Sequence, residues 1–100
     1  MPVKLLMTWD IAPEHERDYF EFVIQEFVPG VQGLGLQPTE AWATIYGEQP
    51  QIMVTMLAES LTLARNAMNS DGWSRLQDKL LALVRNFEYK IVPARGGFQL

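Results

Sequence analysis

The chain has 100 residues, of which 48% are hydrophobic, and a formal net charge of -4. A chain of this length makes one domain, and an acidic chain without a basic block is not expected to bind nucleic acid or an anionic membrane. It has no cysteine and one histidine, which excludes disulfides and a multi-histidine metal site within one copy. We therefore expect no metal and no other cofactor.

The N-terminus carries no targeting pattern. Residues 1–11 lack the long apolar core and the small-residue cleavage site of a signal peptide. No apolar run approaches the roughly 20 residues that span a bilayer. These features predict a cytoplasmic protein.

Charge is distributed unevenly along the chain. The first 59 residues contain nine acids and two bases, whereas the remaining residues contain three acids and six bases. We expect solvated helix faces of opposite charge to lie side by side. Exposed ion pairs between them would each contribute about 0.2–1 kcal/mol.

The first third of the chain predicts a strand and a helix. Alternating apolar residues predict a strand over Val3–Ile11, with Leu5 and Trp9 on one face and Leu6 and Asp10 on the other. Pro13 suits the first position of a helix, which Pro29 and the glycine after it would end. The apolar stripe of that helix is expected to comprise Tyr19, Phe20, Val23, Ile24, Phe27 and Val28.

The middle third predicts a β-hairpin. Residues 31–39 indicate a loop, residues 40–46 a strand, and residues 51–59 another strand. A connection as short as residues 47–50 joins antiparallel neighbours. In the first of these strands Trp42, Thr44 and Tyr46 share one face, and the alternate residues share the other.

The last third predicts an interrupted helix followed by a strand. Ser60 and Ser70 are suited to cap helices over residues 61–69 and 71–86, because the polar residues and Gly72 between them favour a turn. The apolar stripe expected for this region comprises Trp73, Leu76, Leu80, Leu83, Val84 and Phe87. A strand over residues 87–92 would stop at Pro93, which indicates a sheet edge.

The order of these elements, βαββαβ, is typical of a ferredoxin-like α+β fold. Its antiparallel four-stranded sheet carries both helices on one face. The strands nevertheless have apolar residues on both faces, such as Leu6 beside Trp9 and Leu57 beside Met56. An uncovered apolar face indicates an interface, so we expect a homodimer that stacks sheet on sheet. The domain would span residues 1–93, and residues 94–100 would form a C-terminal tail.

Four short segments carry a family resemblance. They are Ile11-Ala12-Pro13-Glu14, Phe27-Val28-Pro29-Gly30, Asp71-Gly72-Trp73 and Phe87-Glu88-Tyr89-Lys90-Ile91-Val92-Pro93. The chain resembles the dimeric α/β-barrel superfamily, which includes NIPSNAP-like and antibiotic-biosynthesis-monooxygenase-like proteins. The resemblance implies a barrel closed across a dimer, with a pocket between each sheet and its helices. It also implies activities that include haem degradation, cofactor-free oxygenation and lactone isomerisation.

Titratable residues offer few candidates for catalysis. His15, the one imidazole, is suited to acid–base work near neutral pH but also fits a plain surface position. Asp10 could act as a base if burial raised its pKa, and Tyr46 is a third candidate. Haem-degrading members of the superfamily resemble one another in using an Asn on the first strand and a Trp and a His on the second helix. Trp73 is present here, although it starts the core stripe, but the first strand has no Asn and the second helix has no His.

Candidates for a ligand pocket are the strand aromatics Trp9 and Trp42, the hydroxyls Thr44 and Thr55, and the helical Trp73. Core packing and cross-strand hydrogen bonds account for the same residues equally simply. Two functions remain open. One is a dimeric protein that binds a small apolar ligand between sheet and helices. The other is a cofactor-free monooxygenase or isomerase that acts on a ring-containing substrate.

Overall fold

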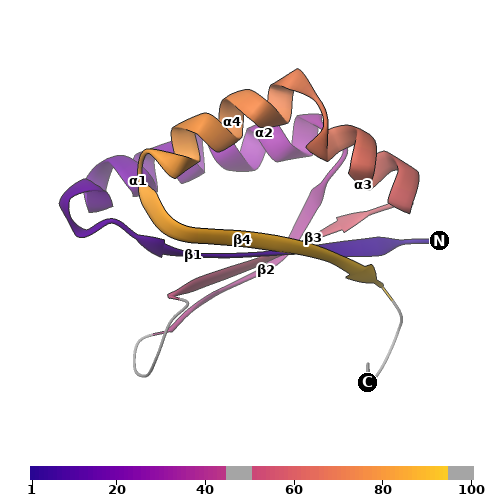
Figure 1. Cartoon of the computed structure of the whole chain (residues 1–100), viewed down its shortest axis with the longest axis horizontal. Coiled ribbons are helices and arrows are strands. Elements are labelled where there is room, and N and C mark those ends of the chain that lie inside the picture. The colour runs from indigo at the N-terminus through magenta and orange to yellow at the C-terminus, as the bar shows by residue number, and fades with distance from the viewer. Residues whose placement is uncertain (45–50, 95–100) are drawn as a thin grey trace.

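The computed structural model describes residues 1–44 and 51–94. Strands β1 (Val3–Ile11), β2 (Gln37–Ala43), β3 (Ile52–Ala58) and β4 (Val84–Pro93) form one sheet in the order β2-β3-β1-β4. Every neighbouring pair is antiparallel. Among the described residues, all helices lie on one face of this sheet, as Figure 1 shows. The predicted α+β ferredoxin-like fold is therefore confirmed.

The first helical region is longer than the sequence predicted. A 3-10 turn, Pro13–His15, leads into α1 (Glu16–Phe22), a π-helical turn (Val23–Phe27) and α2 (Val28–Gly33). The prediction that Pro29 and the glycine after it end the helix was wrong. Proline removes one backbone donor from a helix and crowds the preceding turn. The π-helical turn, which ends two residues before Pro29, widens the helix in this region, and the chain stays helical for another turn.

The π-helical turn also changes which side chains face the sheet. Tyr19 and Phe27 are buried as expected, but Phe20 and Ile24 are exposed, and Phe22 is buried in their place. A single α-helical stripe therefore does not describe this region. The expected loop over residues 31–39 is replaced by the end of α2, a short connection and the start of β2.

The second helical region confirms both predicted caps. Ser60 Oγ accepts a hydrogen bond from the Leu63 N–H at the start of α3 (Leu61–Met68). Ser70 Oγ accepts one from the Trp73 N–H at the start of α4 (Asp71–Leu81). Helix α4 ends five residues earlier than predicted. Val84 already pairs with Ile11 of β1, because its apolar side chain fits a buried strand as well as a helix.

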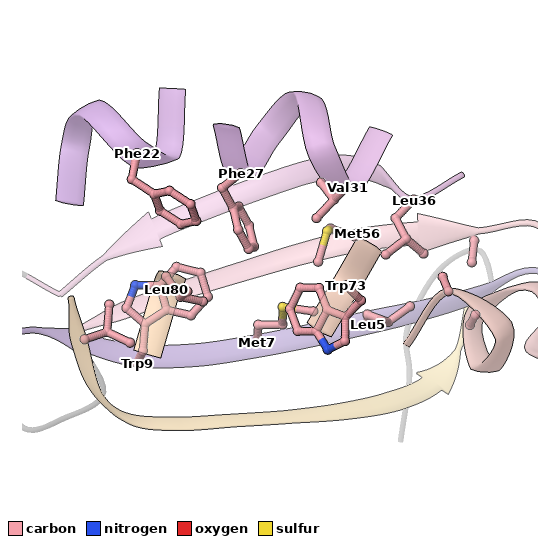
Figure 2. Packing of buried hydrophobic residues seen from close by; sticks show 14 of the residues in the cluster. Leu5, Met7, Trp9, Phe22, Phe27, Val31, Leu36, Met56, Trp73 and Leu80 are labelled. Carbon is pink, nitrogen blue, oxygen red and sulfur yellow. The ribbon is translucent and has the colours of Figure 1, made fainter. Parts of the chain in front are cut away.

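The core lies between the helices and the inner face of the sheet. Figure 2 shows Phe22, Phe27 and Val31 pointing from the first helical region toward the sheet. This core also contains Leu5, Met7 and Trp9 of β1, Met56 of β3, and Trp73 and Leu80 of α4. A Cβ placed on Gly30 would lie 2.6 Å from Leu76 Cδ1, so glycine lets α2 approach α4 closely.

Ion pairs join the two oppositely charged parts of the chain. Lys79 Nζ of α4 lies 2.5 Å from Glu26 Oε1, and an Arg85 nitrogen lies 2.9 Å from Glu14 Oε1. The four side chains in these pairs are between 47% and 61% exposed. The predicted side-by-side placement of acidic and basic faces is confirmed. No helix of the described residues is long and apolar enough to cross a membrane.

Candidate ligand pocket

A cavity of about 440 Å³ lies between the first helical region and the β2–β3 side of the sheet. The helical region contributes Tyr19, Phe20, Val23, Phe27 and Val28. Strands β1, β2 and β3 contribute Trp9, residues 38–43, Ile52 and Val54. Most of these side chains are apolar, and ligand pockets commonly measure about 300–1,000 Å³. The cavity therefore has the size and lining of a site for a small apolar molecule.

The deep end of the cavity is formed by three buried aromatic side chains. Trp9 contacts Phe27 and Tyr19 edge to face, with ring centroids 5.8 and 6.4 Å apart. The Trp9 Nε1–H donates a buried hydrogen bond of 2.9 Å to the Tyr19 hydroxyl. These contacts fix both rings, so this end of the cavity has a defined shape before any ligand binds.

A β-bulge holds Trp9 from the opposite side. The β1–β4 register shifts between Thr8 and Asp10, where two β4 residues, Asn86 and Phe87, face the one residue Trp9. Asn86 adopts a left-handed conformation with φ of 57°. The bulge brings the Phe87 ring parallel to Trp9, with centroids 6.0 Å apart. Trp9 is thereby packed against Phe87, which does not line the cavity, as well as against Tyr19 and Phe27, which do.

The mouth of the cavity is more exposed. Phe20 is 49% exposed, and its ring centroid lies 5.1 Å from that of Tyr19. Across from it lie exposed residues of the edge strand β2, including Ala41 and Trp42. Trp42 is 56% exposed and pairs with Met53, so it borders both the cavity and the outer face of the sheet. A ligand could enter here without unfolding the core.

Polar groups around the cavity are few. The Thr39 hydroxyl is engaged with Thr55 Oγ1 at 2.8 Å. Glu40 lies at the exposed edge strand. Burial raises the pKa of Tyr19 above its ordinary value, and the hydrogen bond from Trp9 only partly opposes that effect. The Tyr19 hydroxyl is therefore a neutral group at physiological pH.

The structure brings together only some of the predicted pocket residues. Trp9 and Trp42 line the cavity. Trp73 lies in the core between Phe27 and Phe87, with centroids 6.2 and 6.3 Å away, and it is not among the cavity's lining residues. Thr55 is buried and bonded to Thr39, whereas Thr44 is exposed and pairs through its backbone N–H with the Gln51 carbonyl. Neither threonine lines the cavity.

Asp10 is buried, as the hypothesis of a catalytic base required, with 7% of its surface exposed. Its two oxygens, however, are both occupied. Oδ1 accepts a hydrogen bond of 2.7 Å from the Gln51 N–H, and Oδ2 accepts one of 2.8 Å from Asn86 Nδ2. Gln51 Oε1 in turn accepts from the Ile11 N–H at 2.9 Å. This network ties the end of β1 to β4 and to the residue before β3.

The remaining catalytic candidates do not gather around the cavity in the described parts of the chain. His15 ends the 3-10 turn before α1, is partly exposed, and is not a lining residue. Tyr46 lies outside the described residues. Across residues 1–44 and 51–94, no three His, Cys, Asp or Glu side chains lie close enough to hold a metal ion.

Sequence reasoning missed Tyr19 as a site residue. The sequence pattern places Tyr19 in the apolar stripe of the first helix, and its ring does pack there. The available signal was chemical: a buried tyrosine hydroxyl requires a hydrogen-bond partner. A tryptophan at an inward position of the adjacent strand could supply one, but the helix–strand pairing that brings the two together is not visible in a single sequence.

Comparisons with known proteins bear on the fold. No family model and no curated protein matches the chain. Among solved structures, a NIPSNAP family protein from Agrobacterium tumefaciens superposes with a TM-score of 0.74 and 14% identity, covering 96% of this chain and 95% of that one. A protein of the ethyl tert-butyl ether d (ethd) family from Bacillus halodurans superposes with a TM-score of 0.73 and 16% identity, covering 95% and 100%.

A candidate antibiotic biosynthesis monooxygenase from Bacteroides thetaiotaomicron is also similar, with a TM-score of 0.66, 16% identity, and coverage of 99% of this chain and 95% of that one. At these identities the likeness shows the fold. The resemblance to NIPSNAP-like and antibiotic-biosynthesis-monooxygenase-like proteins that the sequence predicted is confirmed at this level.

Proposed function

We propose that this protein binds a small apolar ligand in the cavity between the first helical region and the β2–β3 side of the sheet. The observation that carries the proposal is the cavity itself, about 440 Å³ in volume with mostly apolar lining. Burying an apolar molecule there contributes about 25 cal/mol per Å² removed from water. The preformed ring contacts of Trp9 reduce the ordering cost of binding.

Filling the cavity tests this proposal. Ala41 of β2 lines the cavity and is exposed, so Ala41→Trp adds bulk at the mouth with little strain on the core. Ala82 follows α4 and is exposed, but lies away from the cavity, so Ala82→Trp is the matched control. We expect the neutral fluorophore N-phenyl-1-naphthylamine to bind the parent and the control equally, and Ala41→Trp at least tenfold more weakly. Equal binding by all three would place the dye elsewhere and count against the proposal.

We further propose that two copies associate through the outer faces of their sheets. Leu6, Met53, Leu57 and Val92 point away from the helices, because Leu6 alternates along β1 with the inner Leu5 and Met7 and the other three pair with Thr8 or Lys4 on the same face as Leu6. All four are only half-buried. Together with the exposed Trp42 they form an apolar surface on the side of the sheet away from the helices in Figure 1. A surface of this kind is typical of a sheet-to-sheet interface.

Charges on the outer face test the association. Trp42→Glu and Leu6→Glu should each give a native mass of one chain, 11.4 kDa, by light scattering, where the parent has twice that mass. Leu6 does not line the ligand cavity, so its substitution separates assembly from ligand binding. Ile24→Glu on the exposed side of the helical layer is the control and should stay dimeric. A parent that has the mass of one chain at high concentration would refute this arrangement.

The alternative function is a cofactor-free monooxygenase or isomerase with a ring-containing substrate. The fold shared with a candidate antibiotic biosynthesis monooxygenase supports it. The lining favours binding instead, because among the described residues Glu40 is the one carboxylate at the cavity and no imidazole reaches it. General acid–base catalysis needs such groups within hydrogen-bond reach of the substrate. A cytoplasmic location is part of the proposal and rests on the sequence alone.

A further inference from the structure

The hydrogen bond between Trp9 and Tyr19 has only one possible direction. An indole Nε1–H is a donor only, so the Tyr19 oxygen is the acceptor. The proton of the Tyr19 hydroxyl is then left to be donated elsewhere. Within residues 1–44 and 51–94, no side chain or backbone oxygen accepts it. Among the described residues, this buried hydroxyl proton is therefore an unused donor.

The ligand cavity is the place where this donor could be used, because Tyr19 is one of its lining residues. The Tyr19 ring is held by the edge-to-face contacts with Trp9 and Phe20, and the phenol oxygen is fixed by the indole 2.9 Å away. Tyr19 lines the cavity, and the threonine hydroxyl at the same cavity is already bonded to Thr55. The hydroxyl is thus a preorganised polar group among mostly apolar side chains, and such groups commonly orient ligands in pockets of this kind.

We propose that the Tyr19 hydroxyl donates a hydrogen bond to a carbonyl oxygen of the bound ligand, and that the cavity selects uncharged apolar molecules that carry such an oxygen. This inference rests on the ligand site proposed above and names the class of ligand. No bond is made or broken; the hydroxyl proton stays on Tyr19 and is shared with the ligand oxygen.

Charge around the cavity excludes the carboxylate analogues of such ligands. Among the described lining residues, none is a lysine or an arginine, and Glu40 is negative. A carboxylate would lose its hydration without gaining an opposite charge, which is costly in an apolar site. Burial also keeps the Tyr19 hydroxyl protonated, since it raises the pKa of that group, so the donor is present throughout the physiological pH range.

Three naphthalene derivatives of similar shape test the inference: 2-acetylnaphthalene, 2-isopropenylnaphthalene and 2-naphthoate. 2-Isopropenylnaphthalene carries a CH₂ group in place of the carbonyl oxygen of 2-acetylnaphthalene, and 2-naphthoate is an anion. Tyr19→Phe should weaken binding of the ketone by about three- to tenfold, the value of one neutral hydrogen bond. It should leave binding of the alkene unchanged. Titration calorimetry gives both affinities, and 2-naphthoate should bind the parent at least tenfold more weakly than the ketone.

Tyr89→Phe is the control, because Tyr89 lies on β4 and does not line the cavity; it should change neither affinity. If Tyr19→Phe weakens the ketone and the alkene alike, or neither, the inference is overturned. Binding of 2-naphthoate as tightly as the ketone overturns the selection for uncharged ligands. Failure of both neutral compounds to bind the parent would overturn the ligand site itself, which is a different result.

A measurement on the unmodified protein covers the case in which Tyr19→Phe does not fold. The infrared carbonyl band of bound 2-acetylnaphthalene should lie at lower frequency than in an alkane solvent, because a donated hydrogen bond weakens the C=O bond. A band at the alkane position would overturn the inference without any variant.

Discussion

The two faces of the sheet are built from the same kinds of residues but are in different environments. On β1, Leu5 and Met7 face the helices and have no exposed surface, whereas Leu6 between them faces outward and is half-buried. On β3, Met56 is fully buried and its neighbour Leu57 is not. Hydrophobicity alone therefore does not tell which face is the core. The position of the helices decides it, because they cover the inner face and none of the described helices covers the outer one.

The largest expected effect separates the two faces directly. Leu5→Ala should lower the free energy of unfolding by about 2–5 kcal/mol, the usual cost of a cavity in a packed core. Leu6→Ala, one residue away on the outer face, should cost less than about 1 kcal/mol when measured in urea at low protein concentration. Similar losses for both variants would mean that the outer face is covered as fully as the inner one.

The same two variants, Leu5→Ala and Leu6→Ala, also test whether two chains associate through the outer face. If two chains associate through it, the effect of Leu6→Ala should grow with protein concentration, because association adds to apparent stability by mass action. The effect of Leu5→Ala should show no such added dependence beyond that of the parent.

A somewhat smaller loss of stability is expected from substituting Asp10, which lies near the end of β1 beside the β-bulge. Asp10→Ala removes the acceptor of the Gln51 N–H and of Asn86 Nδ2. Leaving partly buried donors unpaired costs about 1–3 kcal/mol. Glu59→Ala, which removes an exposed acid directly after β3, is a suitable comparison and should be nearly neutral. Urea unfolding measures both, and a neutral Asp10→Ala would return Asp10 to the list of catalytic candidates.

Much of the fold could be predicted from the sequence because its signals are local. The alternation over Val3–Ile11 and the serine caps at Ser60 and Ser70 each involve residues within a few positions of one another. The errors occurred where tertiary contacts override local pattern. Pro29 stays within a helix because of a π-helical turn, and Val84 joins β1 instead of extending α4. Neither outcome has a distinct local signature.

The candidate site could be predicted only in part. Trp9 and Trp42 were identified because aromatic residues on strands are conspicuous. The cavity depends on the spacing between the first helical region and β2, which no residue pattern reports. Tyr19 became a candidate only once its hydroxyl was seen against the Trp9 indole.

Another prediction concerns how closely helices α2 and α4 pack against each other above the inner face. Gly30 and Gly33 both lie in α2, but a Cβ on Gly30 would meet Leu76 at 2.6 Å, and one on Gly33 would meet nothing within 4 Å. Gly33→Ala should stabilise the protein by about 0.4–1 kcal/mol through the unfolded chain. Gly30→Ala should lose that gain and destabilise by about 1 kcal/mol, because Leu76 must move. Thermal unfolding decides, and equal stabilisation by both would show that α2 and α4 are less tightly packed.

The smallest effect is confined to alkaline pH and concerns the inner face at Tyr19. Burial raises the pKa of Tyr19 above its ordinary value of about 10. The folded state therefore keeps the proton at a pH where the unfolded chain has begun to lose it. Stability from this residue is then fully present below about pH 10 and falls as the pH rises through the folded-state pKa.

Accordingly, the difference in free energy of unfolding between the parent and Tyr19→Phe should be constant up to about pH 10 and shrink above it. Urea unfolding at a series of pH values measures that difference, and Tyr89→Phe should keep the alkaline loss of the parent. A difference that grows with pH would mean that the Tyr19 phenolate is stabilised in the folded protein, which an apolar cavity wall cannot do.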